Sequence, residues 1–444
     1  MGCRTRVYRM VIGLAILGIQ PIASGPNALG QSPALLEGGM LEAPILDTAV
    51  VDSPPFDTAY AETMPCDVEP ATPGFSAGYD NGFFIKTDDD SFKLKLRGLL
   101  QARHYSNWRE IDPAFGDSTE SGFVVERASL IFAGNAIVPQ LDYWFVLNGD
   151  RSTGTRFVEE ARIGYELSNG MLVQLGRLRN PAFLRELDVS YARQLGIERS
   201  YYNSVFTTGV LEGITLTSQG DSLRMIGFLS DGRHSGSAAK AKDFYLDNAD
   251  IAFTFGADWK LFGEWAQFGD LASWSGEEAA FFLGAGIHYE QGETGDDDLT
   301  NDYNSFLAWT FDLTYENDGF MIFASTVGRH SQNEVIDVNQ SGALLMTSYQ
   351  IIPEKAEPFL RCEYIDFDGF RDVGNIAAVV DDSTVSLVTA GFNWYFDRHA
   401  CKLTVEVTHA FDPLPFTAGN AGIIADQPGS DGQTILGSQV QLFF

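Results

Sequence analysis

The chain has 444 residues, of which 45% are hydrophobic and 20% charged, and its formal net charge is −31. This length is enough for a large core, and the apolar content is too high for a disordered chain. The acidic balance argues against nucleic-acid binding, and four cysteines are too few for a disulfide-stapled scaffold. No run of eighteen apolar residues follows the first thirty, which argues against a helical membrane protein. The 45 glycines and 33 phenylalanines favour a large all-β protein.

Residues 1–30 have the pattern of a secretory signal peptide. Arginines at positions 4, 6 and 9 precede the apolar run Met10–Ile19, and small residues follow before Gln31. An N-terminal membrane helix is the alternative, but the apolar run is too short to span a bilayer. Export makes disulfides possible. Because Cys66, Cys362 and Cys401 would remain after cleavage, an odd number, we expect free thiols.

Residues 31–78 differ in composition from the rest of the chain. They contain seven prolines and eight acidic residues, with no lysine or arginine. Such a segment cannot bury enough apolar surface to fold alone, so we expect a disordered acidic linker. A docking segment for the cell wall or a partner is the alternative. The folded domain is therefore expected to span residues 79–444.

From residue 79 onward the pattern is one of amphipathic strands separated by Gly, Asp and Asn turns. In the segment from Phe92 to Tyr105, apolar and cationic side chains alternate, with Leu99 as the exception on the cationic face. Similar segments cover residues 161–167 and 436–444. Further strands are expected to begin near Phe123, Leu141, Gly209, Leu223, Ile251, Leu261, Phe281, Phe306, Phe320, Leu344, Pro358, Val385 and Lys402.

The connections between these strands alternate in length. Tight turns include Asp318-Gly319, whereas long polar links cover about 106–121, 180–207, 231–247, 330–343, 368–383 and 412–432. Outer-membrane β-barrels have this asymmetry, with short periplasmic turns and long external loops. About seventeen strands can be counted, but closed bacterial barrels have even numbers. We therefore predict a transmembrane antiparallel β-barrel of sixteen strands, with eighteen as the alternative and an error near 271–303.

The last strand is amphipathic and ends on Phe444. This resembles the terminal signal that outer-membrane barrels present to the barrel assembly machinery, which we expect as a partner. Much of the apolar composition is then expected to form a stripe facing lipid rather than a globular core. The expected location is the outer membrane.

Several stretches resemble the phosphate-selective porin O and P family of outer-membrane channels. They are Gly78–Ile85 leading into Phe92–Gln101, then Phe123–Gly134, Leu175–Phe183, Ile197–Ser200 and Thr208–Ile214. The resemblance covers about residues 78–230. It implies a sixteen-stranded barrel, a homotrimer, an inward-folded constriction loop, and passage of small anions such as phosphate.

A channel selects solutes by its width and by the charges that line it. Lys93, Lys95, Arg97 and Arg103 share the polar face of the first long strand. A cation facing lipid at mid-depth would cost about 2–4 kcal/mol, so these four are expected to face the lumen. Arg127 and Arg162 are candidates to join them, and Glu126 and Glu160 could instead neutralise the set.

The long link 180–207 is the candidate constriction loop by analogy with the family. It and its flanks hold Arg177, Arg179, Arg185, Arg193 and Arg199, with Glu186, Asp188 and Glu198 as possible counter-charges. Arginine suits forked recognition of phosphate or carboxylate. The alternative is a surface loop with internal ion pairs.

The charge distribution departs from that of a simple phosphate channel. Residues 79–233 hold 17 basic and 20 acidic side chains, whereas residues 234–444 hold 9 and 32. A weakly selective or cation-preferring general porin is therefore the alternative. The runs Asp88–Asp90 and Asp296–Asp298 are read as solvated loops rather than metal sites.

Two other classes of function are possible for an outer-membrane barrel: a surface adhesin or structural barrel, and a barrel hydrolase. The six histidines are scattered, and no nucleophile, zinc or phosphate-loop motif occurs. We therefore expect no enzymatic activity, no catalytic residue, no metal and no cofactor. The predicted function is passive diffusion of small hydrophilic solutes, anions such as phosphate being preferred.

Overall fold

The computed structural model describes residues 74–112, 116–149, 156–232, 249, 251–291, 305–332, 337–368, 384–426 and 430–444. The predicted signal peptide and the linker up to residue 73 lie outside these residues. The strands are β1 Phe75–Tyr79, β2 Phe83–Thr87, β3 Lys93–Asp112, β4 Gly116–Asn135, β5 Leu141–Gly149, β6 Arg156–Glu166, β7 Leu172–Arg179, β8 Val210–Gln219, β9 Leu223–Ser230, β10 Ile251–Phe262, β11 Ala280–Gln291, β12 Ser305–Asn317, β13 Phe320–Gln332, β14 Asp337–Tyr349, β15 Ala356–Asp366, β16 Thr384–Asp397, β17 Cys401–Ala410 and β18 Thr434–Phe443. The helices are α1 Arg185–Asp188 and α2 Tyr201–Phe206, with short 3-10 turns at Tyr191–Arg193, Gln267–Gly269 and Gly419–Ala421.

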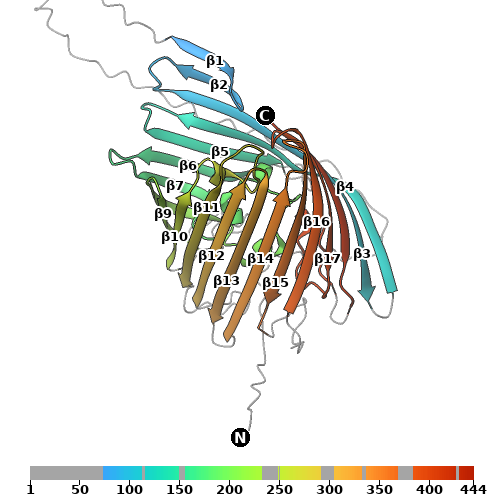
Figure 1. The fold of residues 1–444 in the computed structure, drawn as a ribbon. Coiled ribbons are helices and arrows are strands. Elements are labelled where there is room, and N and C mark those ends of the chain that lie inside the picture. The colour runs from blue at the N-terminus through green and yellow to red at the C-terminus, as the bar shows by residue number, and fades with distance from the viewer. Residues whose placement is uncertain are drawn as a thin grey trace, which may run out of the picture. The chain divides into compact units, whose positions relative to one another are not determined.

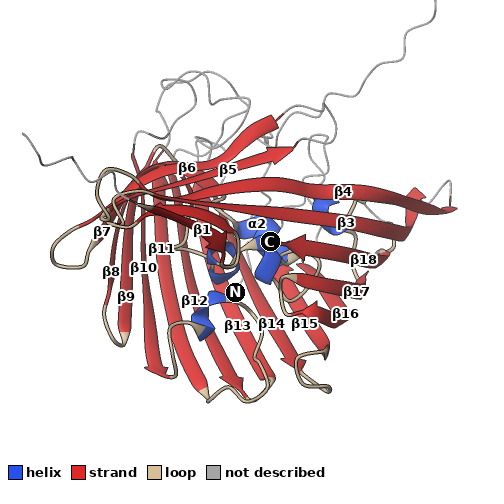
Figure 2. Cartoon of the chain, turned by 90° about the horizontal axis from the view of Figure 1, so that it is seen from above, coloured by secondary structure: helices blue, strands red, loops and turns tan. Residues whose placement is uncertain are grey.

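Strands β3 to β18 form a closed antiparallel barrel of sixteen strands (Figures 1 and 2). Each strand pairs with the next in the chain, and β18 closes the barrel by pairing with residues 99–108 of β3. The predicted number of barrel strands is therefore confirmed. Strands β1 and β2 form a hairpin, and β2 pairs only with the first residues of β3. Because β1 starts at Phe75, strand structure begins within the predicted linker.

One strand predicted from the sequence, the one expected to begin near Leu261, is not a separate strand. Leu261 does not start a strand of its own but is the last residue but one of β10, and residues 263–279 form a long turn before β11. Strand β7 was not among the predicted starts. The predicted Asp318-Gly319 turn is confirmed, with φ of 44° and 83°, the left-handed pair that a two-residue hairpin requires.

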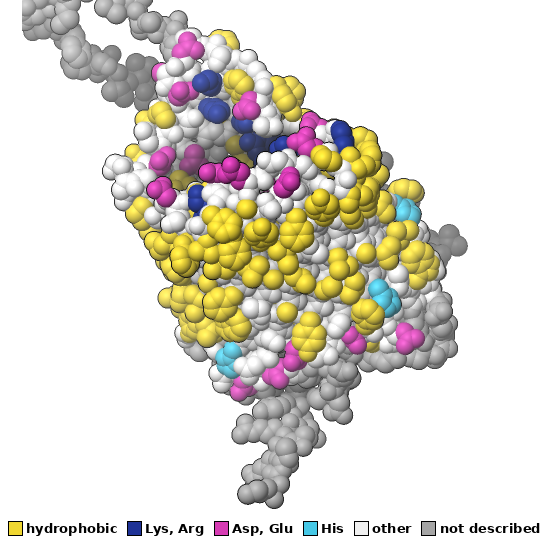
Figure 3. Space-filling model, viewed as in Figure 1, with side chains coloured by type: hydrophobic (Ala, Val, Ile, Leu, Met, Phe, Trp, Pro, Cys, Tyr) yellow, Lys and Arg dark blue, Asp and Glu magenta, His cyan; other side chains and the backbone are white. Residues whose placement is uncertain are grey.

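The outer wall follows the predicted period of two. In β10, Ile251, Phe253 and Phe255 are exposed, whereas the intervening Ala252 and Thr254 are almost inaccessible. Figure 3 shows the result as a belt of hydrophobic side chains around the middle of the barrel on the face in view. Such a belt is the lipid-facing surface of transmembrane barrels.

The inner wall departs from the expected pattern because part of it is apolar. In β13, Met321, Phe323 and Val327 are buried on the inward face. They belong to one cluster with Ile197 and Tyr202, which come from the segment between β7 and β8. The barrel therefore contains a packed core in addition to its outer stripe, whereas the sequence predicted a stripe rather than a core.

The last residue completes the barrel seam. The Phe444 amide donates to the Gly98 carbonyl over 3.0 Å, and its ring lies where a side chain on Gly98 would project, 2.5 Å from an added Cβ.

No helix among the described residues is long and apolar enough to cross a membrane.

Candidate functional site

Residues 180–209, which we call the inner segment, lie inside the barrel. Their backbone is hydrogen-bonded by side chains that the wall directs inward. The Tyr202 amide donates to Glu363 over 2.7 Å, and Lys402 Nζ donates to the Gln194 carbonyl over 2.6 Å. Buried backbone groups need such partners, so the polar residues of β15 and β17 explain why an irregular segment is stable here.

Glu198 joins the inner segment to two strands of the wall. Its carboxylate lies 2.7 Å from Arg127 Nη1 and 3.0 Å from Arg103 Nη1. Burial alone would raise the pKa of Glu198, but the two guanidinium groups overcome this and lower it to about 2. Arg103 also donates to Gln439 and to the Ile197 carbonyl, and only 2% of it is exposed. Its hydrogen bonds therefore join the inner segment to the barrel wall at β3 and β18.

The ring of Tyr191 gathers three of the predicted arginines. The guanidinium carbons of Arg127, Arg199 and Arg179 lie 3.6, 4.1 and 5.4 Å from its centroid. These arginines come from β4, the inner segment and β7. An aromatic face attracts each cation, so Tyr191 brings together like charges that would otherwise repel one another.

The opposite side of the inner segment is tied to β9 and β10. Arg224 Nη2 lies 2.7 Å from both Asp188 and Asp258, and the Arg185 guanidinium carbon lies 3.6 Å from the Phe268 ring centroid. Burial alone would raise the pKa of Asp188, but Arg224 and Arg185 together lower it. Arg185 is therefore an anchor between the segment and the β10–β11 turn.

A cavity of about 250 Å³, which we call the wall cavity, lies between β3–β6 and the inner segment. Its wall contains a row of paired residues, Arg97, Ile131, Val146 and Glu160, each opposite the next on neighbouring strands. The other lining residues are Leu99, Ser129, Trp144, Glu159, Arg179, Asp188, Ser190, Tyr191, Ala192, Arg193, Gly269 and Phe443. Figure 3 shows basic and acidic side chains around a hollow at the barrel end that carries β1 and β2.

Some charges of the wall cavity are paired and others are not. Glu160 lies 2.6 Å from Arg179 Nε and 3.4 Å from Arg162 Nη1. By contrast, Arg97 and Arg193 form no ion pair with any described carboxylate, and among the described residues the Arg193 side chain donates only to the Gly269 carbonyl, over 3.4 Å. The cavity thus presents two cations that form no ion pair with a described carboxylate.

Three predicted residues lie apart from this group. Lys95 pairs with the exposed Asp80 over 3.3 Å, and Arg177 pairs with Glu212 over 3.4 Å. Lys93 lies opposite Lys86 of β2, where β3 extends beyond its pairing with β18. None of the three lines the wall cavity.

Sequence reasoning missed Arg224, Trp144 and Glu159. Arg224 had a usable signal, because it alternates with Leu223 and Met225, which are 41% and 40% exposed on the outer face. Glu159 had none. A register shift between β5 and β6 leaves it unpaired beside Glu160, so two consecutive carboxylates reach one cavity.

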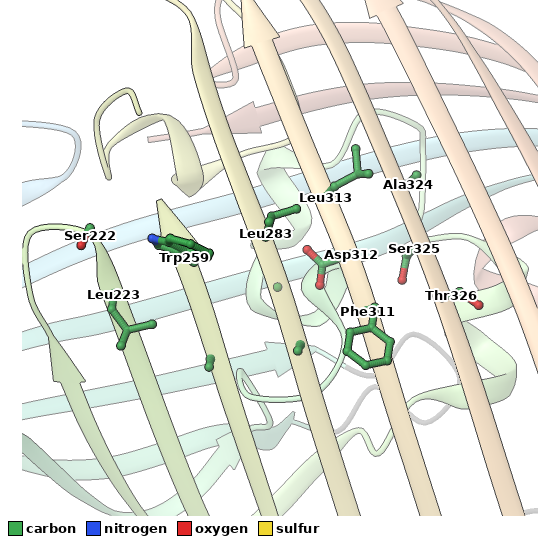
Figure 4. Close-up of a pocket in the computed structure, with 13 residues that line it drawn as sticks. Ser222, Leu223, Trp259, Leu283, Phe311, Asp312, Leu313, Ala324, Ser325 and Thr326 are labelled. Atoms are coloured by element: carbon green, nitrogen blue, oxygen red, sulfur yellow. The ribbon is translucent and has the colours of Figure 1, made fainter. Parts of the chain in front are cut away.

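A second hollow, of about 850 Å³, lies on the wall formed by β9 to β13 (Figure 4). Its lining is mostly apolar and includes Leu223, Trp259 and Phe311, which are exposed to the barrel's surroundings. Because an apolar groove cannot replace the hydration of a polar solute, we do not place a hydrophilic ligand there.

Two further predictions concern metal binding by the acidic runs and the state of the cysteines. Among the described residues, no group of three or more His, Cys, Asp or Glu could hold a metal ion. Asp90 pairs with Lys86 over 3.0 Å, and Asp296–Asp298 lie outside the described residues. Cys362 and Cys401 are free thiols, as predicted, whereas Cys66 lies outside the described residues.

Comparison with protein-family models and with curated protein sequences finds no match. Solved structures, however, share the architecture. OmpF of Salmonella typhi is 13% identical, with 83% of this chain and 100% of that chain covered and a TM-score of 0.55. OprB of Pseudomonas putida is 9% identical, with coverages of 79% and 94% and a TM-score of 0.53. The anion-selective porin from Comamonas acidovorans is 13% identical, with coverages of 79% and 99% and a TM-score of 0.50.

The chain has the fold of an outer-membrane porin. At these identities the likeness concerns the fold alone, so solute and selectivity must be argued from this chain's own residues. The finer resemblance to phosphate-selective porins stays a prediction.

Proposed function

We propose that this protein is an outer-membrane porin through which small hydrophilic solutes diffuse passively, with a preference for anions. The observation that carries the proposal is the wall cavity, where Arg97 and Arg193 have no carboxylate partner among the described residues. Unneutralised cations in a narrow, low-dielectric passage attract anions and repel cations. Inorganic phosphate, expected from the sequence resemblance, is one such anion.

The inner segment is the proposed constriction. Its contacts with β3, β4, β15 and β17 hold it across the lumen, and its residues 188–193 form one side of the wall cavity. Arg97, Arg179 and Arg193 are then pore-lining residues, with Arg162 beside them. Arg103, Arg127 and Arg199 are positioning residues, because the inner segment accepts hydrogen bonds from them. Arg185 is a positioning residue because it ties the inner segment to Phe268 in the β10–β11 turn.

The remaining expectations belong to the same proposal. The hydrophobic belt supports insertion into the outer membrane, and recognition of the last strand by the barrel assembly machinery stays a prediction from the sequence. The signal peptide, the linker, the homotrimer and the absence of enzymatic activity stay predictions from the sequence.

A weakly selective or cation-preferring porin is the second candidate. The acidic excess of residues 234–444, which hold 32 acidic and 9 basic side chains, favours it.

The reversal potential across a planar bilayer in a potassium chloride gradient distinguishes the two candidates. Our proposal expects open-channel steps and a potential of the sign for chloride preference, reduced when Arg97 and Arg193 are both changed to Gln. The matched control is Arg398→Gln, which removes an exposed arginine paired with Glu354. A potential of the opposite sign would favour the second candidate, and repeating the measurement with added phosphate tests for a phosphate site by inhibition of chloride current.

A further inference from the structure

The wall cavity has a cationic end and an acidic end, whereas a site for a simple anion requires only cations. Arg97 stands at one end of the row of paired residues, Glu160 stands at the other, and two aliphatic side chains lie between them. Three interstrand spacings separate the two ends, about 14 Å between backbones. The long side chains of Arg97 and Glu160 shorten the gap between their charges.

The cavity wall carries unsatisfied hydrogen-bond donors, of which only Arg97 stands at the cationic end. Arg97 Nε, Arg179 Nη1 and the Trp144 indole nitrogen are buried and have no hydrogen-bond partner among the described residues. All three residues line the cavity. Buried donors are normally satisfied, so three in one cavity point to a solute that brings acceptors, such as a carboxylate.

The acidic end has an acceptor to offer. Glu160 is neutralised by Arg179 and Arg162, but its neighbour Glu159 accepts a hydrogen bond only from Asn148 Nδ2, over 3.1 Å. Glu159 reaches the cavity because the register shift in β6 places it beside Glu160. Glu159 forms no close ion pair among the described residues, although Arg127 and Arg179 act on its charge at longer range. A carboxylate placed in this way attracts an ammonium group.

We propose that the wall cavity favours small zwitterions that combine well-separated ammonium and carboxylate groups with apolar side chains, as short apolar peptides do. The carboxylate meets Arg97 and Arg193, the ammonium group meets Glu159, and the apolar side chains lie over Ile131 and Val146. The cavity volume, about 250 Å³, is below the roughly 300–1,000 Å³ of sites for drug-sized ligands, which limits the solute to a small one. This inference rests on the proposed channel function.

The test compares three forms of one dipeptide in uptake by proteoliposomes. Leucyl-leucine carries both charges at neutral pH, its N-acetyl derivative carries only the negative charge, and its amide carries only the positive one. We expect the zwitterion to enter about two to five times faster than either derivative, the factor expected of one partly solvated ion pair. Equal rates for the zwitterion and the N-acetyl derivative would overturn the inference.

The variant Glu159→Gln isolates the acidic end. The Gln side chain still accepts the hydrogen bond from Asn148, so only the charge is lost. Zwitterion uptake should fall to the rate of the N-acetyl derivative, whereas Glu354→Gln, on an exposed pair with Arg398, should leave it unchanged. A zwitterion preference that survives Glu159→Gln would also overturn the inference.

The two proposals fail in different ways. If wild-type protein gives anion-preferring conductance but no zwitterion preference, only the assignment of the wall cavity is lost. If it gives no conductance at all, the channel function and the inference that rests on it are both lost. Because the three-solute comparison uses wild-type protein, it decides the question even if a variant does not fold.

Discussion

Glu198 and Arg127 form an ion pair of 2.7 Å that links the inner segment to the barrel wall, and their side chains are only 4% and 7% exposed. A second guanidinium, that of Arg103, lies 3.0 Å from the same carboxylate. One carboxylate therefore neutralises two buried cations on adjacent strands. Removal of this single charge should affect the inner segment more than loss of any exposed ion pair.

The substitution Glu198→Gln should destabilise the barrel by about 3–5 kcal/mol, because it leaves two buried arginines without a counter-charge. The free energy of unfolding can be measured by urea titration in lipid vesicles, followed by tryptophan fluorescence. Glu354→Gln is the control, since the exposed pair with Arg398 should contribute about 0–1 kcal/mol. Equal losses in the two variants would contradict the role assigned to Glu198.

The same ion pairs predict a pH dependence of stability. The folded-state pKa of Glu198 is about 2, against an ordinary value of 4.5, because Arg127 and Arg103 outweigh the cost of burial. The unfolded chain therefore binds more protons in this interval, so the contribution is complete above pH 4.5 and is lost as the pH falls towards 2. Wild-type protein should lose more stability in this window than Glu198→Gln, and parallel curves would refute the assignment.

The barrel could be predicted from the sequence because the side chains on the outward face of its strands are apolar at a period of two. The exposed Phe253 and Phe255 alternate with buried small residues, and a period of two in a chain with tight and long links leaves few architectures. The hydrophobic core inside the barrel could not be predicted from the sequence. Met321 and Phe323 face inward in a strand that is apolar on both sides, and sequence alone does not tell whether such a strand meets lipid or a packed segment.

Part of the candidate site could likewise be predicted from the sequence, and part could not. The inward direction of Arg97 and Arg103 followed from alternation, but their different roles did not. Arg103 meets Glu198, which is 95 residues away in the chain, and only the path of the inner segment brings the two together. Pairing across such separations is set by tertiary structure, so the sequence could name the charges without saying which ones stay unpaired.

Tyr191 should act through its ring rather than its hydroxyl. Each cation–π contact with Arg127, Arg179 or Arg199 is worth about 0.5–2 kcal/mol, depending on its solvent exposure. Tyr191→Ala should lower stability and, because Tyr191 lines the wall cavity, raise single-channel conductance. Tyr191→Phe keeps the ring and should resemble wild type in both measurements. If Tyr191→Phe behaves like Tyr191→Ala, the hydroxyl and not the ring is responsible.

Gly98 should be needed for closure of the barrel at its last residue. A Cβ on Gly98 would lie 2.5 Å from the Phe444 ring, so Gly98→Ala forces the ring away from the seam at a cost of about 1–3 kcal/mol. The folded fraction, read from the heat-dependent migration of the barrel in gel electrophoresis, should fall. Gly122→Ala in β4 is the matched control, because no atom lies within 4 Å of an added Cβ there. A similar yield for both variants would contradict this account of the seam.

Charge reversal at Arg97 and at Arg103 should separate a pore-lining cation from a positioning one. Arg97 lines the wall cavity without an ion-pair partner among the described residues, so Arg97→Glu should move the reversal potential towards cation preference while the barrel stays folded. Arg103 is 2% exposed and paired with Glu198, so Arg103→Glu places two carboxylates in contact and should lower the free energy of unfolding by several kcal/mol. The same gradient measurement and urea titration on both variants give the comparison. An unchanged potential in folded Arg97→Glu would remove Arg97 from the permeation path, since a charge that does not face the moving ions cannot alter their selectivity.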